Sequence, residues 1–92
     1  MAQKVLTASG QIKGGEGNLM ALCMTADGVT SGNKVEIIDS TSATGTAELT
    51  FVFGNTDDVI PFYPCVGMHF DDGIYCKITK TTGTLTVSAV YD

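Results

Sequence analysis

The sequence predicts an all-β fold, an antiparallel β-sandwich of seven or eight short strands. Alternating apolar and polar segments recur at roughly ten-residue intervals, separated by Gly, Asp or Asn turns, a spacing typical of a sandwich or a small barrel. Thr and Gly are plentiful, and they favour pleated strands and the turns between them. No segment is predicted to form a helix longer than one turn. The strand order stays open between jelly-roll-like and immunoglobulin-like, because both folds have strands and turns at this spacing.

The first predicted strand covers residues 4–12 and ends in a glycine-rich loop at 13–18. The three glycines of that loop invite comparison with a phosphate-binding loop. A phosphate-binding loop needs a following helix and either a Lys-Ser/Thr pair or a GxGxxG spacing, and this segment offers none of these. We therefore expect a turn.

The next segment, NLMALCMTA at 18–26, is apolar on both faces. Periodicity alone would also allow a short helix, but Asp27-Gly28 ends the run and its neighbours are strands. Apolar runs of this length often lie centrally in a sheet, so we predict a central strand. Met20 and Met24 are then core residues; the alternative is a contact with another subunit, because methionine suits adaptable interfaces.

The middle of the chain predicts a strand at 34–39, after a turn at 30–33 and before an exposed loop or wide hairpin connection at 40–45. Residues 46–53 alternate cleanly, which predicts a strand with one buried face. That face holds Ala47, Leu49, Phe51 and Phe53.

After a turn at 54–56, residues 57–63 are predicted as an edge strand or an irregular segment, because Pro61 cannot donate to a ladder. A short strand at 66–70 follows. The remaining residues predict a terminal β-hairpin, in which Gly83 of the loop at 80–83 takes positive φ at little steric cost. One face of its arms holds Ile74, Cys76, Ile78, Leu85, Val87, Ala89 and Tyr91.

The composition indicates a single domain over residues 1–92. A chain of 92 residues buries only roughly 60–65% of its extended-chain surface, so we expect modest stability and a tendency to associate. The net charge is −5, with five lysines and no arginine. This balance argues against nucleic-acid binding and against an anionic membrane surface. No run approaches the roughly 20 apolar residues of a membrane span.

The cysteines Cys23, Cys65 and Cys76 are expected to be reduced thiols of a protein made in the cytoplasm, because the opening residues resemble a strand more than a secretion signal. Free cysteine commonly fills inward positions as a small apolar residue. A zinc site would need all three cysteines to converge on His69, the single histidine. We expect no metal and no cofactor.

The densest charge features are the acidic pairs at 57–58 and 71–72. Neither pair has the ligand spacing of a calcium loop, and adjacent strand residues point to opposite faces, which makes each pair a poor acid–base dyad. With a single histidine and no GxSxG motif, no nucleophile–base set can be assembled. We predict that the protein is not an enzyme and has no catalytic residue.

Four segments, SGQIKGG, SGNKVEIIDSTSATGT, VIPFYPCVGMHFDDGIYCKIT and GTLTVSAVYD, resemble small all-β structural proteins of tailed bacteriophages. The likeness extends over nearly the whole chain. It implies a non-enzymatic virion component, such as a capsid decoration, cement or head-fibre protein, made in the host cytoplasm. The alternatives are a neck, tail or fibre component, or a receptor- or carbohydrate-binding module.

The implied partners are further copies of the chain, in a homo-oligomer, and other virion proteins such as the major capsid protein. Candidate contact residues are apolar positions on the predicted edge and on the outer face of the last strand. An edge strand is a natural surface for β-augmentation between copies. The candidates are Pro61, Phe62, Tyr63, Pro64 and Val90.

Overall fold

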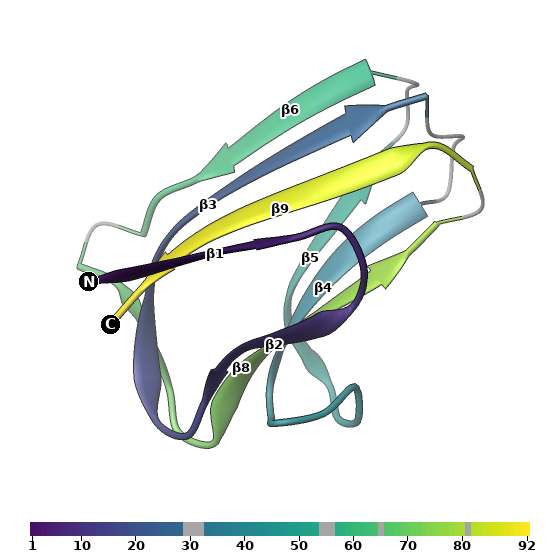
Figure 1. Cartoon of the computed structure of the whole chain (residues 1–92). Coiled ribbons are helices and arrows are strands. Elements are labelled where there is room, and N and C mark those ends of the chain that lie inside the picture. The colour runs from purple at the N-terminus through teal and green to yellow at the C-terminus, as the bar shows by residue number, and fades with distance from the viewer. Residues whose placement is uncertain (29–32, 54–56, 65, 81) are drawn as a thin grey trace.

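The computed structural model describes residues 1–28, 33–53, 57–64, 66–80 and 82–92 (Figure 1). These residues form nine strands and no helix, which confirms the all-β class and adds one strand to the upper predicted number. The turns predicted at 30–33 and 54–56 lie mostly or wholly outside the described residues. The strands are β1 (Ala2–Leu6), β2 (Gly10–Gly14), β3 (Gly17–Asp27), β4 (Asn33–Asp39), β5 (Ala47–Phe53), β6 (Asp57–Phe62), β7 (Met68–Phe70), β8 (Gly73–Thr79) and β9 (Thr84–Tyr91).

The strands form two antiparallel sheets that face each other (Figure 1). The first sheet has the order β1-β9-β3-β6, and the short β7 also pairs with β3. The second sheet has the order β2-β8-β4-β5. The predicted antiparallel β-sandwich is confirmed, and β6 lies at an edge of its sheet as predicted.

The pairing follows one long hairpin whose tip is the connection between β4 and β5. Moving outward from the tip, β4 pairs with β5, β3 with β6 and β7, β2 with β8, and β1 with β9. Rolling this hairpin brings β9 beside β3 and β8 beside β4. This is the strand order of a jelly roll, the double-sheet form built from two Greek keys. Of the two alternatives, the structure has the jelly-roll order.

The predicted C-terminal hairpin is correct in its faces and wrong in its pairing. Its arms, β8 and β9, belong to different sheets, so the chain crosses the sandwich between them. The predicted inner residues, such as Cys76 and Val87, are fully buried, and Gly83 has a φ of 76°. A period of two specifies which face is buried, whereas the neighbouring strand is chosen by the whole fold.

The prediction of one strand at 4–12 is also wrong, because the chain bends between β1 and β2 and changes sheets. The Ser9 side chain bonds to the backbone of β8 at this bend. Its Oγ accepts a hydrogen bond from the Ile78 N–H at 2.8 Å and lies 3.3 Å from the Ile78 carbonyl oxygen. At this bend, the Ser9 side chain therefore makes the hydrogen bonds to β8 that the backbone of a paired strand would otherwise make.

The central strand β3 is confirmed, and it lies between β9 on one side and β6 and β7 on the other. A register shift between Leu19 and Ala21 interrupts its alternation. Leu19 faces the core before the shift, and Leu22 and Met24 face it afterwards. Met24 is therefore a core residue, while Met20 at the shift is half-buried.

The core lies between the inner faces of the two sheets. Phe51 of β5 and Phe62 of β6 pack edge to face, with ring centroids 5.6 Å apart, and so join the sheets along one side. The buried apolar residues come from seven strands: Ile12, Leu19, Leu22, Met24, Ala26, Val35, Ile37, Phe53, Phe70, Ile74, Cys76, Leu85, Val87 and Ala89.

Two glycines with positive φ offer a matched test of backbone packing. A Cβ at Gly83 would lie 2.5 Å from the Asp27 carbonyl oxygen and overlap the backbone of Gly28, whereas a Cβ at Gly15 would meet open space. Gly15→Ala is expected to cost about 1–2 kcal/mol, the penalty of the left-handed conformation alone. Gly83→Ala is expected to cost roughly 3 kcal/mol or more, because overlap is added. Urea unfolding measures both, and equal losses would contradict the close approach.

Candidate functional site

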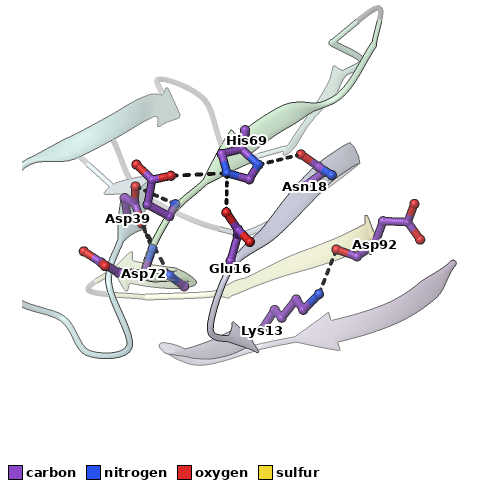
Figure 2. Close-up of polar contacts among 9 residues, drawn as sticks. Lys13, Glu16, Asn18, Asp39, His69, Asp72 and Asp92 are labelled. Carbon is purple, nitrogen blue, oxygen red and sulfur yellow. Dashed lines mark hydrogen bonds and ion pairs between the residues drawn. The ribbon is translucent and has the colours of Figure 1, made fainter.

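A polar cluster lies at one end of the sandwich, around His69 of β7 (Figure 2). The His69 Nδ1 lies 3.0 Å from the Asn18 Oδ1. Its Nε2 lies 3.0 Å from the Glu16 Oε2 and 3.2 Å from the Asp71 Oδ1. Because an amide oxygen only accepts, Nδ1 carries a proton in this arrangement. The Glu16 contact connects β7 to the turn between β2 and β3, and the Asp71 contact stays within the turn that follows β7.

A carboxylate beside this cluster holds the turn that leads from β7 to β8. The Asp39 Oδ1 accepts hydrogen bonds from the N–H groups of Asp72 at 2.8 Å and Gly73 at 3.3 Å, and its Oδ2 accepts one from Asp71 at 3.1 Å. The N–H groups of Asp72 and Asp71 contribute most to holding the pKa of Asp39 below its usual value. Asp39 ends β4 and so ties the second sheet to the crossing of the chain between sheets.

The same turn is too tight for a side chain at Gly73. A Cβ there would lie 2.8 Å from the Ser40 carbonyl oxygen and 3.1 Å from that of Lys13. On the other side of the cluster, the Lys13 Nζ donates to the Asp92 carbonyl oxygen at 2.9 Å (Figure 2). These contacts join the ends of β2 and β9 with the turn that enters β8.

A metal ion would find three ligand atoms in the cluster, one each from Glu16, His69 and Asp71, all within 4.8 Å of one another. They would offer one nitrogen and two oxygens to a divalent cation. All three side chains are exposed, and the described contacts already join the same atoms to one another. The arrangement is accounted for as a link between two turns.

The described cysteines do not converge on His69. Cys76 is fully buried on the inner face of the second sheet, where burial raises the pKa of its thiol to about 12. Cys23 is half-buried and pairs with Ser88 and Pro61 on the outer face of the first sheet. The inward position expected for the cysteines is thus confirmed for Cys76 and wrong for Cys23. Cys65 lies outside the described residues, as do the side chains of Asp57 and Asp58.

Of the five predicted contact residues, two lie on the outer face of the first sheet, two follow β6, and one points into the core. Pro61 is exposed and Val90 is half-buried, both on the outer face of the first sheet. Tyr63, just beyond β6, is 70% exposed, and Pro64 is half-buried. Phe62 points inward and packs on Phe51, so it belongs to the core rather than to the surface set.

The outer face of the first sheet carries a second candidate surface, which we term the uncharged face. Register places its side chains in three rows across the strands. None of them is charged, and two of them, Val5 and Val59, are 55% and 61% exposed. The rows are Gln3, Val90 and Ala21; Val5, Ser88, Cys23 and Pro61; and Thr86, Thr25 and Val59.

The outer face of the second sheet is different in kind. Lys34 and Glu36 of β4 form an ion pair at 3.6 Å, and Lys77 of β8 is the register partner of Glu36. The apolar Ile38 on this side is only 2% exposed. A Cβ at Gly45 would lie 3.4 Å from its methyl group, so the loop after β4 approaches it. The outer face of the second sheet therefore carries charge on its central strands, whereas the first sheet has three uncharged rows, bordered by a fourth row that holds Asp27 beside Thr84.

Within the described residues no pocket is found, and no helix is long and apolar enough to span a membrane. Comparison with family models, curated proteins and solved structures finds no match to the chain.

Sequence reasoning missed Asp39, because its donors are more than thirty residues away along the chain. An acidic residue at the end of an apolar strand was the one local sign of it. The exposed valines Val5 and Val59 were also missed, because the single strand expected at 4–12 hid the outward position of Val5.

Asp39→Asn tests the role of this carboxylate in the β7–β8 turn. The pKa of Asp39 is lowered in the folded state, so its contribution to stability is present above the unfolded pKa of about 3.9 and is lost as the pH falls through the folded value. We expect the variant to melt several degrees lower at about pH 7 and to match the wild type at the lowest pH.

Thermal melts across this pH range measure the difference. Asp72→Asn also removes one carboxylate beside this turn but leaves the Asp39 carboxylate with its three donors, so it should show little of this loss. A loss from Asp39→Asn that is independent of pH would contradict the assignment.

Proposed function

We propose that this protein is a non-enzymatic virion component of a tailed bacteriophage. It decorates or stabilises the capsid through self-association or by docking on the major capsid protein. The jelly-roll strand order carries the proposal, because viral capsid domains use this architecture. The resemblance of the four sequence segments supports the phage origin. The step from fold to function is one of analogy.

The distribution of charge also supports a role in assembly. A surface that binds protein is poor in charged residues at its centre, and the uncharged face meets this condition on a chain of net charge −5. The same acidic balance, with no arginine, favours protein partners over nucleic acid or an anionic membrane.

A receptor- or carbohydrate-binding module is the second candidate, since lectin domains also use jelly rolls. Such a module is expected to present a platform of exposed aromatic rings. Of the seven aromatic residues, all of them described, only Tyr63 is mostly exposed. One ring makes a small platform, which is why we place this candidate second, alongside a position in the neck, tail or fibre.

Quantitative mass spectrometry of purified particles tests the proposal. We expect the chain in particles of the phage whose genome encodes it, at a copy number that is a multiple of three, five or six, as symmetric particles require. A low copy number shared with a tail protein would place it in the neck, tail or fibre. Absence from the particles, or a gene outside any phage or prophage genome, would overturn the proposal.

A further inference from the structure

We propose that the uncharged face is the surface through which two copies of this chain bind each other, sheet against sheet. As a route to particle assembly, this inference rests on the proposed function and names the surface that performs it. Four observations carry it: the distribution of charge, the exposed aliphatic groups, the small size of the central side chains, and the chemistry of the β6 edge.

The distribution of charge favours the uncharged face over the outer face of the second sheet as the contact surface. Each copy has a net charge of −5, so two copies repel wherever their carboxylates come close. The three rows of the uncharged face hold no ionisable side chain apart from the thiol of Cys23, and the carboxylate of Asp27 lies in the next row, at the border. The opposite face presents Lys34, Glu36 and Lys77 on its central strands. Burying the charged face would require desolvation of these charged groups, whereas burying the three uncharged rows requires desolvation of neutral polar groups only.

The exposed apolar groups are also distributed unevenly. Among described residues, the large hydrophobic side chains that are mostly exposed include Val5 and Val59 on the uncharged face; three others, Met1, Tyr63 and Val66, lie outside the strands. Only Val52 is comparably exposed on the second sheet. Contact between two uncharged faces would remove these valines from water, which is the main favourable term in association.

The middle of the face is lined by small side chains, so another flat sheet can approach closely. Ala21, Cys23 and Ser88 lie between Val5 on one edge strand and Pro61 on the other. Sheets that stack face to face pack about 10 Å apart when their side chains interdigitate. A second copy presents the same small centre and the same valine flanks, as a two-fold interface requires.

The edge of β6 is less suited to pairing with another strand. Pro61 has no N–H, and it lies within β6, where an added strand would lose a ladder bond. When two faces stack, the side chains of Pro61 and Val90 make the contact, and no backbone N–H donor is needed. The predicted contact residues Pro61 and Val90 therefore act through the face.

The area of the uncharged face determines how strong a dimer we expect. Four strands about 4.8 Å apart and five residues deep cover roughly 300–400 Å² in projection, so the two copies together cover roughly 600–800 Å². Stable interfaces bury about 1,200–2,000 Å² in total. The dimer should be weak, in the micromolar range or above, and many copies on one particle would strengthen it through effective concentration.

Sedimentation equilibrium over a dilution series tests the inference with matched valines. Val59 and Val52 lie on edge strands of the two sheets and are 61% and 62% exposed. Val59→Glu or Val5→Glu should weaken dimerisation roughly tenfold or more, because a carboxylate would be buried in the contact. Val52→Glu makes the same change in net charge on the opposite face and should leave the dimer intact.

Thiol labelling gives a second readout that does not depend on substitution of the face. In a Cys65→Ser chain, maleimide labelling of Cys23 should slow as protein concentration rises, while Cys76 stays unlabelled at all concentrations. Moderate salt should strengthen the dimer, since it screens repulsion between acidic copies. Chelation of divalent cations should leave it unchanged, because the polar cluster around His69 takes no part.

A wild-type chain that stays monomeric to millimolar concentration would overturn the inference, and so would equal weakening by Val52→Glu and Val59→Glu. Dissociation on chelation would assign the contact to the polar cluster instead and would also overturn it. None of these results bears on whether the chain is present in phage particles, so the proposed function stands or falls by its own measurement.

Discussion

The fold depends on the repeated crossing of the chain between its two sheets. Among the strands described, only the β4–β5 and β6–β7 connections stay within one sheet. Each crossing takes the backbone out of a ladder and needs other partners for its polar groups. Asp39 supplies them for the β7–β8 crossing with three accepted hydrogen bonds. At the β1–β2 crossing, the Ser9 side chain bonds to the Ile78 backbone of β8. A few short polar side chains thus stabilise the crossings of a sandwich whose interior is apolar except for Asn33.

Alternation along the sequence was sufficient to predict the class, most strands and their buried faces. Leu85, Val87 and Ala89 had to share a face because neighbouring strand residues point to opposite sides. The same alternation does not predict which strands pair with each other. β8 and β9 looked like a hairpin because they are joined by a short loop, yet each pairs with strands far away in the sequence. The bend between β1 and β2 was missed because its cause, the Ser9 contact with Ile78, spans 69 positions.

The candidate surfaces were predictable only in part, for the same reason. Pro61 was assigned to an edge because proline lacks a donor, and Val90 to an outer face by its alternation with Ala89. Pro61 and Val90 lie on the same face because β6 and β9 pair with β3 on its two sides. The polar cluster joins His69 to Glu16 across more than fifty positions. These two residues come together only when the whole chain has folded, so no local sequence pattern predicts the cluster.

The nested order of the strand pairs has a consequence for how the chain reaches its fold. β4 and β5 are close in sequence, and each further pair outward can form once the pair inside it has brought its strands together. Every such step closes only a short additional loop, which keeps the entropy cost of each step small. The last pair, β1 with β9, joins Ala2 to Tyr91. Because this pairing is so distant in sequence, we expect it to be the last of the nested pairs to form.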